Sequence, residues 1–180
     1  MNHMPTITEN TQLLIEAAKQ GNVNEIQRLI PISDPKVNHS QALKLAAGNG
    51  HTQCVELLIP VSSPKSYDSY ALRMAARNGH IECVKLLIPV SDPQADHSAA
   101  LQWAVQYGHT RPTVFQGHTQ CMELLYPVSD PQAALDALKE DFPDHPKIWI
   151  ALEQRIEAER LRGVLSNEVG KGTPDRKHKM

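Results

Sequence analysis

Apolar and small residues recur along this chain with a spacing of 29 residues. The stretch ALKLAAGNGHTQCVELLIP, which begins at Ala42, returns as ALRMAARNGHIECVKLLIP beginning at Ala71. Glycines and prolines keep the same spacing, at Gly21, Gly50, Gly79 and Gly108 and at Pro31, Pro60 and Pro89. Self-similarity at such a period indicates a repeat architecture, in which each unit buries its apolar face against its neighbours.

The pattern within one unit predicts two helices and a turn. In the second repeat, residues 40–49 carry an apolar face at helical spacing, and Ser40 is the expected N-cap. Gly50 suits a positive φ at the end of this helix. A second helix is predicted over residues 51–59, where Pro60 ends it. A stack of such helix pairs is an all-α solenoid.

The phrase A-L-x-L-A-A-x-N-G-H-x-x-C-V-x-L-L resembles the ankyrin repeat, and the resemblance covers residues 11–141. The usual ankyrin period is ~33 residues, and the residues missing here fall where ankyrin repeats place a projecting β-hairpin. The Thr-Pro-Leu-His opening of the family is also replaced, by Gln41-Ala-Leu-Lys44 in repeat two. We therefore expect compact loops without hairpins, as in the short-period ankyrin proteins common in bacteria, and a binding surface carried by the first, inner helix of each repeat.

The two ends of the array break the pattern. Glu16 and Glu25 occupy core positions of the first repeat, which fits a terminal unit that no preceding repeat covers. After a partial repeat, an apolar stripe of Trp149, Leu152 and Ile156 predicts a long helix, which we interpret as the outer helix of the last unit and a cap. The predicted organisation is a tail at 1–10, repeats near 11–39, 40–68, 69–97 and 98–130, a partial repeat at 131–141, a capping helix at 142–170 and a disordered tail at 171–180.

The spacing also changes once inside the array. Pro89 and Pro127 are 38 residues apart, so nine extra residues, 109–117, are expected to form a long connector between the two helices of repeat four. They carry Arg111 and Phe115, and the triplet Gly-His-Thr occurs on both sides of them. Insertions of this kind often contribute to a binding face, whereas the repeated triplet also fits a neutral duplication.

Composition narrows the function classes. A formal net charge of −2 gives no electrostatic reason to expect nucleic acid or an anionic membrane as a partner. No apolar run has the length of a membrane span, and the first residues lack the pattern of a secretory signal. The three cysteines occupy one repeat position and are expected to be free thiols. We expect a cytoplasmic monomer, and export into a host by a route without a signal stays open.

The recurring His-x-x-Cys phrase, as in His80 and Cys83, could suggest zinc. A closed site needs four donors around one ion, but helices in neighbouring repeats pack ~8–10 Å apart, so the pairs cannot converge. No nucleophile motif, phosphate loop or placeable carboxylate pair occurs. We therefore predict no metal, no cofactor and no catalytic residue.

Columns that differ between repeats are those that the fold leaves free, and interface hot spots favour Trp, Tyr and Arg. Trp103 shares a column with Leu45 and Met74, so it could also be a core residue. The sequence predicts a protein-binding scaffold whose concave inner-helix and loop face, around repeats two to four, holds a partner protein. The predicted contact residues are Lys44, Tyr70, Arg73, Arg77, Trp103, Gln106, Tyr107, Arg111 and Phe115. The alternative is an adaptor or a bacterial effector or inhibitor that acts through its long C-terminal helix or by self-association.

Overall fold

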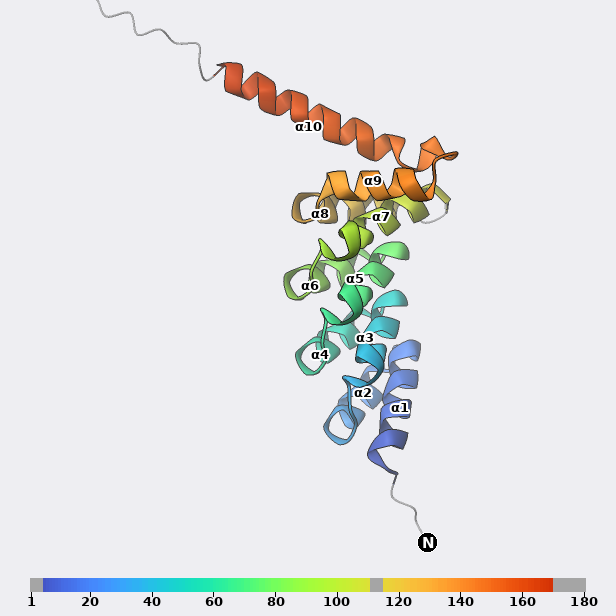
Figure 1. Ribbon diagram of the computed structural model, residues 1–180. Coiled ribbons are helices and arrows are strands. Elements are labelled where there is room, and N and C mark those ends of the chain that lie inside the picture. Colours follow the sequence, from blue (N-terminus) through green and yellow to red (C-terminus); the bar gives the residue numbers. More distant parts are fainter. Residues whose placement is uncertain (1–4, 111–114, 170–180) are drawn as a thin grey trace, which may run out of the picture.

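The computed structural model describes residues 5–110 and 115–169 and arranges them as a stack of helix pairs (Figure 1). The first three pairs are α1 (Ile7–Gln20) with α2 (Val23–Leu29), α3 (Val37–Gly48) with α4 (Thr52–Leu58), and α5 (Ser66–Arg77) with α6 (Ile81–Leu87). They are followed by α7 (Ala95–Thr110), α8 (Phe115–Leu125), α9 (Pro131–Asp141) and α10 (Ile150–Val169). The described ranges contain no strand, so the prediction of an all-α solenoid without β-hairpins is confirmed.

The helices form two parallel rows. The inner row is α1, α3, α5, α7 and α9, each in contact with the next, and the outer row is α2, α4, α6 and α8 (Figure 1). Each of these outer α-helices ends in a 3₁₀ turn that contains a proline, at Ile30–Ile32, Ile59–Val61, Ile88–Val90 and Tyr126–Val128. The proline lacks an N–H and disfavours the α conformation of the residue before it, so the chain leaves the helix there.

A short left-handed segment begins the inner helices of repeats two, three and four. Three consecutive residues have positive φ in each, namely Asn38, His39 and Ser40, then Tyr67, Asp68 and Ser69, then Asp96, His97 and Ser98. Asn, Asp and His adopt this conformation more readily than other residues with a side chain. The segment reverses the chain direction within a few residues, and it stands where longer ankyrin repeats carry a hairpin.

The serine that ends each left-handed segment joins the start of an inner helix to the loop after the outer helix of the same repeat. The buried hydroxyl of Ser40 accepts a hydrogen bond of 2.8 Å from the backbone N–H of Ser63, in the loop after α4. Ser69 and Ser98 accept equivalent bonds from the N–H groups of Asp92 and Asp130. The prediction that Ser40 caps its own helix was therefore wrong, because its hydroxyl instead accepts a hydrogen bond from a backbone N–H in the loop after α4.

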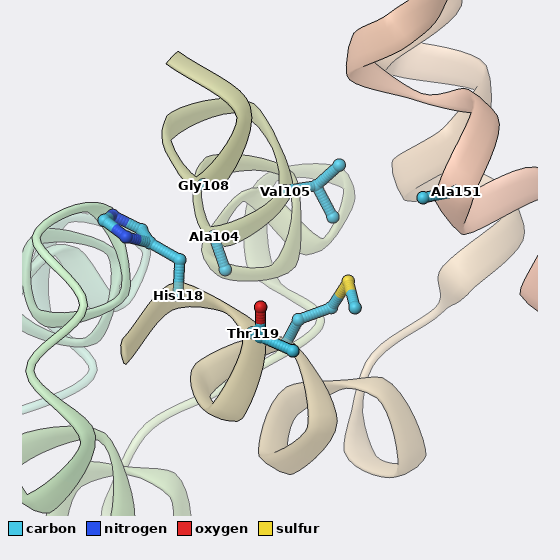
Figure 2. Close-up of a pocket in the computed structure, with 7 residues that line it drawn as sticks. Ala104, Val105, Gly108, His118, Thr119 and Ala151 are labelled. Carbon is cyan, nitrogen blue, oxygen red and sulfur yellow. The ribbon is translucent and has the colours of Figure 1, made fainter. Parts of the chain in front are cut away.

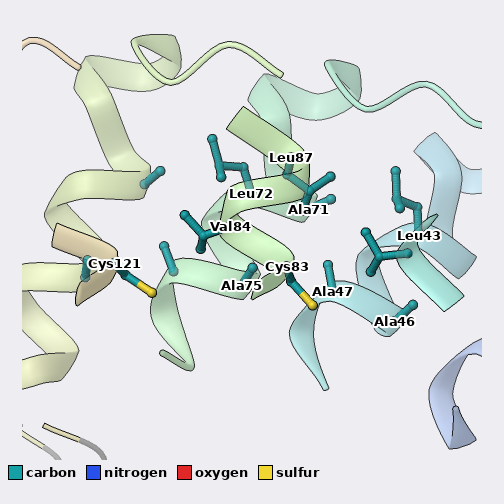
Figure 3. Packing of buried hydrophobic residues seen from close by; sticks show 14 of the residues in the cluster. Leu43, Ala46, Ala47, Ala71, Leu72, Ala75, Cys83, Val84, Leu87 and Cys121 are labelled. Carbon is teal, nitrogen blue, oxygen red and sulfur yellow. The ribbon is translucent and has the colours of Figure 1, made fainter. Parts of the chain in front are cut away.

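Leucines, alanines and cysteines at equivalent positions make one continuous core along the stack (Figure 3). Leu43, Leu72 and Leu87 are fully buried between the two rows of helices. Small alanines at Ala46 and Ala75 let neighbouring inner helices approach closely. On α4, Cys54, Val55 and Leu58 are buried in this core, whereas Leu57 is only half-buried.

The first helix begins earlier than predicted. Thr6 and Glu9 form a capping box at the start of α1, with each side chain bonded to the other residue's backbone N–H. The helix therefore includes four residues that the sequence analysis assigned to the N-terminal tail. Glu16 is exposed on this terminal repeat, and Glu25 lies at the surface beside Arg28, with which it forms an ion pair.

The extra residues of repeat four lengthen both of its helices. The last residue of α5, Arg77, corresponds to Gln106, but α7 continues to Thr110. The first residue of α6, Ile81, corresponds to Thr119, but α8 already begins at Phe115. The expectation of one long connector was therefore wrong, since helix accounts for all of the extra length except residues 111–114, which lie outside the described ranges.

The C-terminal helix does not occupy the place of a fifth outer helix. α10 packs on α9, and Figure 1 shows it crossing the end of the stack and extending well beyond it. Leu152 is fully buried at this contact, while Ile150, Leu161 and Val164 are exposed. Its interpretation as an outer helix was wrong, because α8 and α10 lack the extensive contact that α6 and α8 make. Neither α10 nor any other helix of the described ranges has the length and apolar character of a membrane span. The predicted disordered tail lies outside the described residues.

Candidate functional site

Aromatic rings from two neighbouring inner helices form a continuous row on the inner face of the array. Tyr67 and Tyr70 belong to α5, and their ring centroids lie 5.5 Å apart with an edge-on orientation. Tyr70 makes a similar edge-on contact with Trp103 of α7, at 5.9 Å. Edge-to-face pairs of this kind are attractive beyond the apolar area that they bury. The rings therefore hold one another in place across the boundary between repeats three and four.

Arg73 lies at the centre of these rings. Its guanidinium carbon is 5.0 Å from the centroid of Tyr70 and 5.2 Å from that of Trp103. It forms an ion pair with Asp96, which belongs to the left-handed segment of the next repeat. The side chain is only 7% exposed, so Arg73 positions the rings and the loop and offers little surface to a partner.

Arg77 and Tyr107 extend the row toward the ends of α5 and α7. The guanidinium carbon of Arg77 lies 4.7 Å from the Tyr107 centroid and 5.8 Å from the Trp103 centroid. Its Nε is buried without a hydrogen-bond partner, and no carboxylate within the described residues forms an ion pair with it. Arg77 is half-buried, as are Trp103 and Tyr107, so all three keep some exposed surface.

Lys44 closes the opposite end of the cluster. Its ammonium group lies 5.7 Å from the Tyr70 centroid, and burial lowers the pKa of Lys44 below its usual value. We call the set of Lys44, Tyr67, Tyr70, Arg73, Arg77, Trp103 and Tyr107 the aromatic–basic strip. It brings together six of the nine predicted contact residues. Gln106 is half-buried on α7, Arg111 lies outside the described residues, and the side chain of Phe115 is likewise not described.

The comparison with protein families assigns the architecture. The family model for ankyrin repeats, which spans three copies, matches residues 62–134, from the loop before α5 into α9. Residues 62–134 of this chain are ankyrin repeats. Ankyrin repeats are protein–protein interaction modules, and the family is typically non-enzymatic. No curated protein matches the chain.

One column that looked unconstrained in the repeats has a structural task. Lys44, Arg73 and Gln102 occupy equivalent positions, and each donates a hydrogen bond to a backbone carbonyl of its own left-handed segment. The acceptors are the carbonyl oxygens of Asn38, Tyr67 and His97, respectively. The column therefore varies in residue type but keeps a long side chain with a donor at its end.

Asn49, Asn78 and Tyr107 occupy another column that differs between repeats, and its two asparagines also stabilise the array. The amide of Asn78 donates to the carbonyl of Gly48 at 2.7 Å, and Asn49 makes the equivalent bond to Lys19. Only Tyr107, the third member of this column, projects a ring into the aromatic–basic strip. The positions that differ between repeats therefore include residues that hold the array together as well as residues of the aromatic–basic strip.

Two contributors to the strip were missing from the predicted contact residues. Tyr67, 59% exposed, presents the most accessible ring of the strip, and Asp96 neutralises Arg73. Both occupy the column of Asn38, where the residue type differs in each repeat. That difference was the available signal, but their geometry depends on the left-handed backbone, which the sequence pattern did not predict.

The histidines of the His-x-x-Cys phrases bond to the preceding repeat. The Nε2 of His80 lies 3.1 Å from the Gly48 carbonyl, and the Nε2 of His118 lies 2.7 Å from the Arg77 carbonyl. Cys83 and Cys121 are fully buried, and burial raises the pKa of the Cys121 thiol to about 12. Within the described residues, no three His, Cys, Asp or Glu side chains gather as metal ligands would.

A small apolar cavity lies beside repeat four. It has a volume of about 120 Å³ and opens between α7, α8 and the start of α10 (Figure 2). Ala104, Val105, Met122 and Ala151 supply most of its walls, and the His118 ring lies at one edge with its Nε2 bonded to the Arg77 carbonyl. The cavity results from the unusual path of α10, which leaves this side of α8 without a fifth outer helix.

Proposed function

We propose that this ankyrin array is a non-enzymatic cytoplasmic scaffold that binds a partner protein through the aromatic–basic strip on its inner helices. The observation that carries this proposal is the clustering of four aromatic residues with two arginines across α5 and α7. The chain has few aromatic residues, since Phe, Trp and Tyr make up 4% of it. Four of its eight Phe, Trp and Tyr residues lie together in the aromatic–basic strip, so this face is much richer in aromatic side chains than the chain as a whole.

The chemistry of the strip is that of an interface centre. Trp, Tyr and Arg dominate binding hot spots because each combines a large apolar surface with a polar group. In the strip they are packed against one another before any partner arrives, so little side-chain entropy remains to be lost on binding. Tyr67 supplies an exposed ring. Trp103 and Tyr107 supply half-buried rings beside the half-buried Arg77 guanidinium.

Catalysis is disfavoured by the state of the reactive groups. The side chains that could act as nucleophile or base in the His-x-x-Cys phrases are already engaged or buried. His80 and His118 bond to backbone carbonyls, and burial raises the pKa of the Cys83 thiol, which keeps it in its unreactive protonated form. These groups serve packing between repeats.

The test uses residues that the array itself places at equivalent positions. Tyr67→Asn imports the residue of Asn38, which has the same left-handed backbone, and Arg77→Gln imports the residue of Gln106. The double variant should lose partner capture from lysate by more than about tenfold. Its thermal unfolding should stay close to that of the parent, because surface substitutions usually change stability by no more than ~0.5 kcal/mol.

The control lies on the outer face. Glu56→Lys with Lys85→Glu exchanges two exposed residues of α4 and α6 without altering net charge. Lys85 forms only a surface ion pair with Glu82, so its loss should cost less than ~1 kcal/mol. If this outer-face exchange abolishes capture while the inner-face variant binds normally, the assignment to the inner face is wrong.

The C-terminal helix supports a second, weaker candidate. Leu161 and Val164 are about half exposed on α10, a helix that extends past the stack (Figure 1). A variant with Leu161→Glu and Val164→Glu should retain the partner if the strip is the site. Loss of capture or of self-association in this variant alone would instead assign binding to α10. We expect the parent chain to sediment as a monomer.

A further inference from the structure

The three cationic side chains of the aromatic–basic strip differ in the groups with which they already interact. Arg73 is paired with Asp96, and Lys44 donates to the carbonyl of Asn38 at 2.8 Å. Arg77 instead packs against Tyr107 and Trp103, and its Nε is buried without a hydrogen-bond partner. Within the described part of the chain, it therefore stands as a cation partly removed from water and not matched by a carboxylate.

The surroundings of Arg77 would strengthen an ion pair between its guanidinium and a carboxylate of a partner. Rings on one side of a guanidinium exclude water, and electrostatic interactions grow as the local dielectric constant falls. A guanidinium also offers a planar set of donors that matches a carboxylate with two parallel hydrogen bonds. An incoming carboxylate would find a preformed site at Arg77, with the Tyr107 and Trp103 rings beside it for the flanking side chains.

Charge is not uniform along the inner helices. The acidic residues Asp68 and Asp96 lie at the starts of α5 and α7, whereas Arg77 is the last residue of α5. Because Asp96 is paired with Arg73 and Asp68 is exposed, the loop end attracts a negatively charged segment less than Arg77 does at the far end of α5. The arrangement selects both the charge and the orientation of what binds.

We propose that the partner contacts this strip with an acidic peptide segment that places a carboxylate on the Arg77 guanidinium, next to Trp103 and Tyr107. This inference rests on the proposed function, because it specifies the chemistry of the partner at the same face. It requires that the rings be contacted at their exposed edges by the residues flanking the acid.

A single-stranded nucleic acid is the other anion that rings and cations can bind, and the geometry disfavours it. Stacking of bases needs open ring faces together with a continuous cationic groove. Here guanidinium groups lie over Tyr70, Trp103 and Tyr107. Arg73 is neutralised by Asp96, and Asp68 is exposed beside it, so a phosphate backbone would meet carboxylates at the loop end.

The experiment is a selection of short random displayed peptides on the immobilised full-length chain. The expected winners are enriched in Asp or Glu, and their synthetic versions should bind at least about tenfold more weakly to the Arg77→Gln variant. Lys85→Gln is the matched control, because it removes one positive charge from the outer face and should leave binding unchanged. Arg77→Lys should rescue only part of the affinity, because an ammonium group lacks the planar fork.

The outcomes separate this inference from the function on which it rests. Peptides that need Tyr67 and Arg77 but carry no excess of acidic residues would overturn the acidic segment while leaving the strip as the binding face. Peptides that bind the Tyr67→Asn, Arg77→Gln double variant as well as the parent would overturn the proposed face itself. Failure to select any peptide, or tighter binding of a labelled oligothymidylate than of the acidic peptides, would also overturn the inference.

Discussion

Repeats three and four make the same histidine contact with the preceding repeat, although nine more residues separate the glycine from the histidine in the fourth. In repeat three, Gly79 ends the inner helix with a positive φ, and His80 follows it directly to reach the Gly48 carbonyl. In repeat four, Gly108 stays inside α7, and His118, ten residues later, reaches the Arg77 carbonyl. The contact between repeats therefore depends on where the histidine side chain lies against the preceding repeat. The number of residues between the glycine and the histidine can change without loss of this contact.

The array is less regular beside repeat four than beside repeats two and three. Regular repeats cover each other's outer helices, whereas α8 borders the cavity lined by Met122 and Ala151. The same irregular region places Trp103 and Tyr107 on the face that we propose as the binding site. Repeat three thus provides the rigid part of the strip, and repeat four provides the part that differs most from the repeat pattern.

The largest expected effect tests whether both repeats belong to one core. Leu87 in α6 and Leu125 in α8 are equivalent and fully buried. Leu87→Ala and Leu125→Ala should each lower the free energy of unfolding by ~2–5 kcal/mol, the range for truncation of buried leucines. Urea denaturation followed by circular dichroism measures this. Leu86→Ala, at a half-buried position, is the milder control, and a negligible cost at Leu125 would mean that repeat four is not part of the core.

A smaller effect should distinguish the two histidines. In a His80→Ala chain, the amide of Asn78 still donates to the Gly48 carbonyl at 2.7 Å, so we expect a loss of ~0.5–1.5 kcal/mol. The counterpart of Asn78 in repeat four is Tyr107, and His118 is 1% exposed. Removing a buried partner costs more, so His118→Ala should cost ~1–3 kcal/mol. Thermal and chemical unfolding of the two variants give the comparison, and a larger loss at His80 would contradict it.

The smallest expected effect on stability follows from removing the insertion. Deleting residues 109–117 joins Gly108 to His118 and restores the 29-residue spacing of the other repeats. The shortened connection would match those of repeats two and three, where Gly50 and Gly79 turn the chain with positive φ, so the free energy of unfolding should shift by less than ~1 kcal/mol. Partner binding should persist if the described strip carries it. Loss of binding by a folded deletion variant would instead give Arg111 and Phe115 a role at the interface.

Residue identity alone identified much of the candidate site. Tyr70, Arg73, Arg77, Trp103 and Tyr107 were selected because they interrupt the repeat pattern, and they do lie together. Their separate roles were not predictable. Arg73 looks as free as Arg77 in the sequence, but Arg73 forms an ion pair with Asp96 and is enclosed by three rings, whereas Arg77 forms no ion pair within the described residues. The difference comes from contacts with the next repeat, and comparing equivalent positions of the repeats does not show which residues contact one another.

The sequence by itself determined that this chain is a helical repeat array. Periodic leucines and alanines, a glycine suited to positive φ and a proline after each outer helix are local signals, and each acts within a few residues of itself. Only the tertiary structure decided which of two Gly-His-Thr triplets joins repeat four to repeat three, where α10 lies, and how three residues turn left-handed before an inner helix. These outcomes depend on contacts between residues about 20 to 40 positions apart, such as Ser40 with Ser63 and His118 with Arg77. The spacing of residues along the chain does not predict these contacts, because packing decides which side chains come within hydrogen-bonding distance of each other.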